Sequence, residues 1–159
     1  MRSRAASFEL APADPSSADA QYCLGHYFDE LAARFRGGFD RNRDAAADVT
    51  DLALPEGYLL IARLSGRAVG CAGLRALAPG VGELKRMWVA PAARGMGIGR
   101  SFLRELEAEA RRRGLRALRL DTNESLSEAL QLYRSCGYRE IARFNDNPYA
   151  HYWFEKVLA

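Results

Sequence analysis

Three glycines alternate with other residues directly before a stretch whose apolar residues recur at helical spacing. They are Gly95, Gly97 and Gly99, in the segment RGMGIGRSFL that begins at Arg94. Glycine holds helices and strands poorly, so its repeated use here needs a reason. A loop without side chains lets a ligand approach the backbone, and the following helix offers unpaired N–H donors and a partial positive charge. These residues predict a phosphate-binding loop at a helix N-terminus.

Two common glycine motifs do not fit this segment. A Walker loop ends in Gly-Lys followed by Ser or Thr, whereas Arg100 and Ser101 follow Gly99 here. A dinucleotide fingerprint needs Gly-x-Gly-x-x-Gly after the first strand, and residues 95–99 read Gly-x-Gly-x-Gly. Taken alone, the glycines fit a tight strand-to-helix turn about as well as a ligand loop.

Two sequence blocks together carry a family resemblance. Arg94-x-x-Gly97-x-Gly99, preceded by Val89-x-Pro-x-x-Arg, resembles the pyrophosphate loop of the GNAT N-acetyltransferase superfamily. A second block of that family, Ala-x-x-Leu-Tyr-x-x-x-Gly-Phe/Tyr, is matched downstream by Ala129, Leu132, Tyr133, Gly137 and Tyr138. The resemblance covers residues 83–141, with both blocks in the family's order and at its separation. It implies that the glycines make room for coenzyme A.

The resemblance further implies acetyl-coenzyme A as the co-substrate. The residues that it places against the coenzyme are Trp88, Val89, Arg94, Gly95, Met96, Gly97, Ile98, Gly99, Arg100, Asn123 and Tyr133. Among them, the backbone N–H of Val89 would polarise the thioester oxygen. Leu126 stands where many members have an asparagine that holds the pantetheine arm, and Asn123 is the candidate substitute.

Two side chains are the candidates for proton transfer. Glu83 lies six residues before Val89, the position of the catalytic glutamate in some members, and would accept the proton of the attacking amine. Its alternative is a solvated glutamate or one paired with an arginine. Tyr133 matches the family tyrosine that faces the coenzyme sulfur and would act as the acid, although its spacing also fits a half-buried helix aromatic. Cys136 has no placed histidine, so we expect direct attack in a ternary complex.

The acceptor pocket of the family is made by the first helices and the final hairpin. The candidates there are Tyr27, Glu30, Phe35, Tyr149 and His151, with Trp153 beside them. We expect a small-molecule amine as the acceptor, an amino acid or a related metabolite. A protein-lysine acetyltransferase and a non-catalytic acetyl-coenzyme A-binding regulatory module are the alternatives.

The elements that must position these residues follow from the hydrophobic pattern. Strands are expected at about residues 7–11, over both arms of a hairpin in 58–77, and at 82–89, 116–122, 138–144 and 151–158. Helices are expected after Ser16 or Ser17, within residues 42–54, from the glycine loop to Gly114, and from a Ser125–Glu128 capping box to Gly137. This order predicts an α/β (α+β) fold with a mixed, mostly antiparallel sheet of six to seven strands flanked by about four helices, the GNAT-like acyl-CoA N-acyltransferase fold.

The whole chain limits the remaining function classes. Its 159 residues fit one domain, residues 1–159, and hydrophobic and charged contents of 48% and 27% are ordinary for a globular protein. The net charge of +3 is spread along the chain, which gives no case for nucleic acid. The N-terminus has no apolar run typical of a secretory signal, and no stretch is long enough to span a membrane. Three scattered cysteines favour a reducing, cytoplasmic location, and two histidines leave no metal cluster. The C-terminal segment NDNPYAHYWFEK resembles that of a bacterial subgroup of the family, which implies a bacterial protein. The resemblance also allows a homodimer.

Overall fold

The computed structural model describes residues 7–40 and 45–159, so residues 42–44 of the second expected helix lie outside it. Its strands are β1 (Phe8–Pro12), β2 (Tyr58–Leu64), β3 (Arg67–Ala78), β4 (Val81–Val89), β5 (Ala117–Thr122), β6 (Arg139–Ile141) and β7 (Tyr152–Val157). Its helices are α1 (Ala18–Arg34), α2 (Ala45–Asp51), α3 (Ile98–Arg112) and α4 (Ser127–Ser135), with a 3-10 turn, η2, at Pro91–Ala93. The predicted fold class is confirmed.

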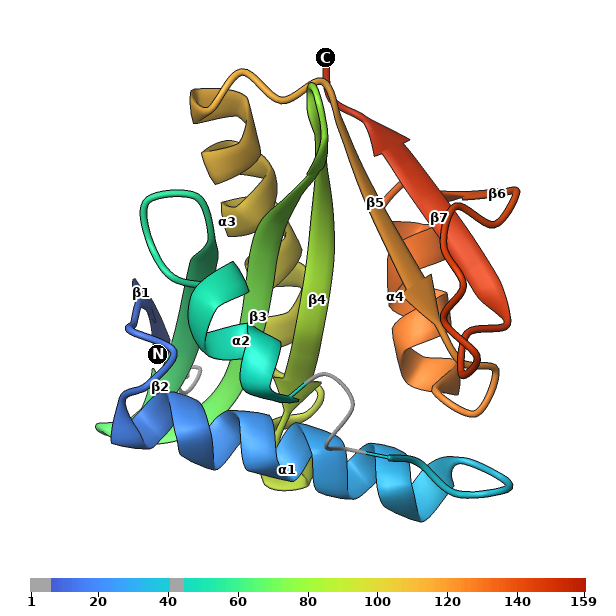
Figure 1. The fold of residues 1–159 in the computed structure, drawn as a ribbon. Helices are drawn as coiled ribbons and strands as arrows, with labels where there is room; N and C mark the ends of the chain where they lie inside the picture. Colours follow the sequence, from blue (N-terminus) through green and yellow to red (C-terminus); the bar gives the residue numbers. More distant parts are fainter. Residues whose placement is uncertain (1–6, 41–44) are drawn as a thin grey trace, which may run out of the picture.

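The strands form one mixed sheet in the order β1-β2-β3-β4-β5-β7-β6. All neighbours are antiparallel except β4 and β5, which run parallel and pair only over residues 81–83 and 117–119. Beyond these three pairs the two strands diverge toward α1, as Figure 1 shows. The sheet is therefore held together at one end of β4 and β5 and splayed at the other.

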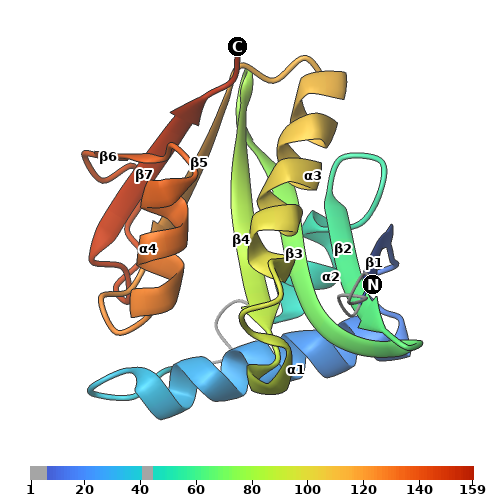
Figure 2. The same ribbon diagram turned by 180° about the vertical axis from the view of Figure 1, so that it is seen from behind.

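The helices cover the sheet in different places. Figure 2 shows α3 and α4 on the same face of the sheet, α3 against β3 and β4 and α4 against β5 and β7. The main core lies beneath these two helices, where apolar residues line one face of α3: Ile98, Phe102, Leu103, Leu106 and Ala110. Helix α2 lies on the opposite face, and α1 crosses the splayed end of β4 and β5 (Figure 1).

Strand β4 carries an irregularity just after its pairing with β5 ends. The register with β3 shifts between Cys71 and Gly73, and Arg86 has a left-handed backbone with φ 61°. The Cys71 thiol donates a hydrogen bond to the Arg86 carbonyl at 3.1 Å. The Arg86 side chain forms a buried ion pair with Asp48 of α2, with 2.9 Å between Nε and Oδ2. A β-bulge of this kind bends a strand and increases its twist, so it turns β4 away from β5.

The helix starts differ in how well the sequence predicted them. Ser17 caps α1 as predicted and accepts a hydrogen bond from the Ala20 N–H at 3.3 Å. The capping box predicted at Ser125 and Glu128 is wrong, because α4 begins after Leu126 without a side-chain cap. Glu128 forms an ion pair with Arg34 of α1 instead, at 2.9 Å. The first strand of the final hairpin is also shorter than predicted, since β6 ends at Ile141.

Candidate active site

The glycine loop connects η2 to α3 and leaves the first turn of that helix open. Gly95 and Gly97 both have left-handed backbones, with φ of 86° and 87°, and Gly97 is the N-cap. A Cβ placed on either glycine would meet no atom within 4 Å, so the space above the loop is empty. The N–H groups of the first helical turn have no partner within the helix. The predicted loop geometry is therefore present, with open space beside Gly95 and Gly97 at the start of α3.

A cavity of about 420 Å³ lies over this loop, and we call it the loop cavity. It is bounded by the end of β4, the glycine loop, α1 and α4. Its wall holds most of the residues predicted to bind the coenzyme, namely Trp88, Val89, Arg94, Gly95, Gly97, Ile98, Gly99 and Arg100. The structure thus brings the predicted loop and the end of β4 together around one space.

The two arginines at the loop cavity contact protein groups. Arg94 donates from Nε to the Val89 carbonyl at 3.0 Å and forms an ion pair with Glu30 of α1. Arg100 donates to Ser135 Oγ at 3.3 Å at the C-terminal end of α4. A phosphate at the loop would find both cations nearby and would compete with Glu30 for Arg94.

Three of the residues predicted to bind the coenzyme either make contacts beyond the loop cavity or lie outside it. The Trp88 ring is buried and stacks on His26 of α1, with 5.3 Å between ring centroids. Met96 is half-buried against the main core and does not line the loop cavity. Asn123 also lies outside that cavity, and its amide donates to the Tyr149 carbonyl at 2.7 Å and accepts from the Ser125 N–H at 2.9 Å. Asn123 thus holds the turn between β5 and α4.

A second, smaller cavity of about 90 Å³ lies where β4 and β5 diverge, and we call it the strand cavity. Both predicted catalytic side chains, Glu83 and Tyr133, line it. It shares five lining residues with the loop cavity: Tyr27, Leu31, Met87, Leu126 and Ala129. The two cavities are therefore adjacent, with these shared residues between them.

Glu83 is buried, with 1% of its surface exposed, and is paired with an arginine. The Arg75 Nε donates to Glu83 Oε1 at 2.7 Å, and the same guanidinium contacts Asp51 of α2 at 3.0 Å. The arginine pairing that the sequence left open as an alternative is thus present. Glu83 nevertheless lines the strand cavity, so the carboxylate that pairs with Arg75 also borders this space.

Tyr133 lies on the face of α4 that packs against the sheet. Its side chain is 8% exposed, and burial raises its pKa above the ordinary value for tyrosine. No hydrogen-bond partner of its hydroxyl is present among residues 7–40 and 45–159. Because its pKa is raised, the hydroxyl keeps its proton at neutral pH, and Tyr133 lines the strand cavity.

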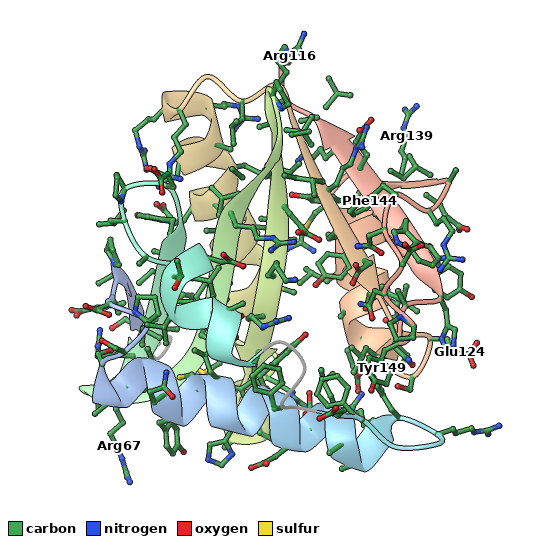
Figure 3. The ribbon with its side chains drawn as sticks, viewed as in Figure 1. Arg67, Arg116, Glu124, Arg139, Phe144 and Tyr149 are labelled. Atoms are coloured by element: carbon green, nitrogen blue, oxygen red, sulfur yellow. The ribbon has the colours of Figure 1, made fainter. Side chains whose placement is uncertain are left out.

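The predicted acceptor residues lie in three different places: at the strand cavity, at the loop cavity, or at neither. Tyr27, Phe35 and Tyr149 line the strand cavity, and Figure 3 shows Tyr149 beside the C-terminal end of α1. Glu30 lines only the loop cavity, next to Arg94. His151 is exposed and accepts a hydrogen bond from the Glu124 N–H at 3.1 Å, and Trp153 donates to Asn145 at 2.9 Å. Neither His151 nor Trp153 lines the loop cavity or the strand cavity.

Sequence reasoning missed several polar and aromatic residues of the strand cavity. They are Phe39, Lys85, Arg86, Asp121 and Asn147. Alternation along β4 places Lys85 on the same face as Glu83, which was a usable signal. Asp121 is the last residue but one of β5, a position at the end of a strand beside a parallel neighbour, where ligand sites often lie.

The chain resembles known acetyltransferases in sequence. Residues 25–138 match the model of the acetyltransferase (GNAT) family. An IAA acetyltransferase from Azospirillum brasilense is 43% identical over 103 residues, which are 64% of this chain and 66% of that protein. The N-alpha-acetyltransferase RimI from Mycobacterium tuberculosis is 38% identical over 127 residues, 78% of this chain and 75% of that protein. The chain thus spans slightly less than two thirds of the Azospirillum relative.

Solved structures agree on the fold. The crystal structure of a GNAT-family acetyltransferase from Staphylococcus aureus matches with a TM-score of 0.83 and 19% identity, over 96% of this chain and all of that one. At this identity the likeness concerns the fold. The residues matched by the family model include the glycine loop, Glu83 and Tyr133.

Proposed function

Because the chain belongs to the acetyltransferase (GNAT) family, we propose that it transfers the acetyl group of acetyl-coenzyme A to the primary amine of a small molecule. One observation carries the proposal: a cavity over a glycine loop adjoins a cavity that holds a carboxylate and a protonated tyrosine. The loop cavity suits a diphosphate that accepts hydrogen bonds from backbone N–H groups, and the strand cavity suits proton transfer.

The coenzyme residues proposed are those that line the loop cavity. The backbone donors of Gly97, Ile98 and Gly99 would take the pyrophosphate, with Arg94 and Arg100 as neighbouring cations. The Val89 N–H, at the end of the bulged strand, would stabilise the oxyanion that forms on the thioester carbonyl. Asn123 would act indirectly, since its amide holds the turn before α4.

The reaction proposed is one direct displacement. The amine nitrogen attacks the thioester carbonyl carbon, its proton passes to Glu83, and the carbon–sulfur bond breaks. Tyr133 gives its proton to the departing thiolate. Both side chains line the strand cavity, and Cys136 lines neither cavity, which favours a ternary complex over an acetylated cysteine.

The size of the strand cavity supports a small acceptor. About 90 Å³ is available, and aromatic residues of α1, the following loop and the β6–β7 loop line it. The rings of Phe39 and Tyr149 lie 4.7 Å apart between centroids. A protein amino group is the second candidate, favoured by the 38% identity to RimI.

The test is release of free thiol from acetyl-coenzyme A in the presence of small amines and of peptides. We expect small amines to be turned over faster than peptides. Glu83→Gln keeps the size of the side chain and removes its basicity, so kcat should fall about 10²- to 10⁴-fold.

The matched control is Asp51→Asn, which changes the other carboxylate on Arg75 but does not line either cavity. It should retain most of the turnover. Wild-type activity in Glu83→Gln would exclude this carboxylate as the base. Preference for peptides would favour the protein acceptor.

A further inference from the structure

Lys85 is a half-buried cation on the wall of the strand cavity. Its ammonium forms no ion pair and no hydrogen bond within the described part of the chain. Burial is the main cause that lowers its pKa below the ordinary value for lysine. An ammonium that is partly buried without a hydrogen-bond partner carries a desolvation cost, which the charges of Glu83 and Asp121 offset only in part, so its presence needs a reason.

The other charged side chains of the strand cavity all have partners. These pairs are Glu83 with Arg75 at 2.7 Å, Arg86 with Asp48 at 2.9 Å, and Asp121 with Asn145 and Asn147 at 2.6 and 3.0 Å. Lys85 is thus the charged group of this wall that the described residues leave for a ligand.

The sheet register places Lys85 beside the proposed reaction. Glu83 and Arg119 are the last paired residues of β4 and β5. Two residues further along, Lys85 and Asp121 lie on the same face of the two strands, where these have begun to diverge. Lys85 is therefore one side-chain repeat from the proposed base, about 7 Å along the strand.

We propose that Lys85 binds a carboxylate of the acceptor, so that the substrates are amino acids or other small amino carboxylates. This inference rests on the proposed function. An amine directed at Glu83 and a carboxylate at Lys85 would match the two ends of one small molecule. An anionic ligand would also supply the hydrogen bonds that the ammonium lacks.

The experiment compares matched acceptors, amino acids and the amines that differ from them by loss of the carboxylate, in the thiol-release assay. The wild type should prefer the amino acids. Lys85→Met should raise KM for amino acids about 10- to 100-fold, the effect of losing one hydrogen bond to a charged group, and leave the plain amines unchanged. Lys85→Arg should restore part of the preference.

Two further measurements separate recognition from a structural role. Lys156→Met is the control, because Lys156 pairs with Glu107 outside the cavity, and it should leave acceptor preference unchanged. Lys85→Met should unfold at the same temperature as the wild type or higher, since it removes a poorly solvated charge.

The preference should also depend on pH. The charges of Arg86 and Glu83 on β4, Arg75 on β3 and Asp121 on β5 act on the Lys85 ammonium. Because the pKa of Lys85 is lowered, its charge is lost at a lower pH than in a free lysine. The preference for amino acids should therefore decline as pH rises into the alkaline range.

The possible results are distinct. Equal turnover of both acceptor classes, with no change in Lys85→Met, would overturn the role of Lys85 while leaving the acetyltransferase proposal intact. A loss of kcat on both classes in Lys85→Met would also overturn it, because it would show a role in the reaction itself. Failure of the wild type on every amine would remove the proposed function and this inference with it.

Discussion

Tyr133 owes its protonation state to burial. The side chain lies between α4 and the sheet, with the ring of Tyr138 at 6.0 Å and that of Phe154 at 6.3 Å between centroids. Burial is the largest cause of its raised pKa, followed by the nearby Tyr27 and Asp121. A phenol in this environment keeps its proton across the neutral range, so its hydroxyl is available as a hydrogen-bond donor to the departing sulfur.

Tyr133→Phe should lower kcat about 10- to 100-fold, because the leaving thiolate would lose its proton donor. Affinity for coenzyme A should change little, since Tyr133 does not line the loop cavity. Steady-state kinetics with a saturating amine, together with coenzyme binding by calorimetry, measure the two effects.

Tyr138→Phe is the matched control for this substitution. Its hydroxyl donates to Glu107 at 3.0 Å and lines neither cavity, so the change should lower stability but not the kcat of the folded protein. Equal kcat in wild type and Tyr133→Phe would assign the proton to another group or to water.

Helix α3 contributes its N-terminus to the loop cavity through the backbone of Gly97. We expect Gly97→Glu to weaken coenzyme A binding at least 10-fold, because a side chain would enter the empty space above the loop and bring negative charge toward the phosphates. The left-handed φ of 87° also means that any side chain strains this position. Calorimetric titration with coenzyme A measures the loss.

Gly114→Glu controls for that backbone strain at the other end of the same helix. Gly114 has φ 75° and no atom within 4 Å of an added Cβ, so the two substitutions impose similar local costs. Both variants should unfold at lower temperature, and Gly97→Glu alone should lose affinity. Parallel losses of affinity in both would point to strain in α3 and away from a phosphate at its N-terminus.

The sequence predicted the elements and the family well, because each depended on local signals. Residues 94–99 and the spacing around Tyr133 indicated the loop, the fold and the proposed coenzyme site. The start of α4 was predicted wrongly, since Ser125 and Glu128 fit a capping box, yet Arg34 of α1 pairs with Glu128. That competing ion pair joins residues 94 positions apart in sequence.

The strand cavity was harder to predict, because it also depends on contacts between residues far apart in sequence. The bulge that opens the strand cavity uses a left-handed Arg86, whereas glycine is the residue whose presence signals such a backbone. Asp121 and Asn147 come together only because β5 pairs with β7 and the loop before β7 folds back, with 3.0 Å between Asn147 Nδ2 and Asp121 Oδ1. The spacing of residues in the sequence does not reveal contacts that form in this way.

At the scale of the whole molecule, the sheet has two parts that are joined by one short parallel pairing, which we call the seam. Strands β1 to β4 form one part and β5, β7 and β6 the other, and the parallel pairing that joins them extends over three residue pairs. Among residues 7–40 and 45–159, no helix is long and apolar enough to cross a membrane. Since the sheet is continuous, we propose that the chain folds as one domain. We expect a ligand bound at the seam to contact both of its parts.

Coenzyme A should therefore stabilise the entire chain. The loop cavity is lined by β4 and the glycine loop on one side and by Leu126, Ala129 and Leu132 on the other. A ligand at 100 times its Kd adds about 2.7 kcal/mol to the free energy of unfolding, which for a chain of this size raises Tm by about 5–10 °C. Differential scanning fluorimetry with and without coenzyme A tests the shift.

Hydrogen exchange then shows whether the ligand acts across the seam. Intact coenzyme A should slow exchange in β5 and α4 as well as at the start of α3, because its pantetheine arm would contact the α4 side. A fragment that ends at the pyrophosphate should protect the start of α3 and leave β5 and α4 nearly unchanged. If both ligands protected only α3, the pantetheine arm would not reach α4, and the thioester could not lie between the two cavities as the proposed reaction requires.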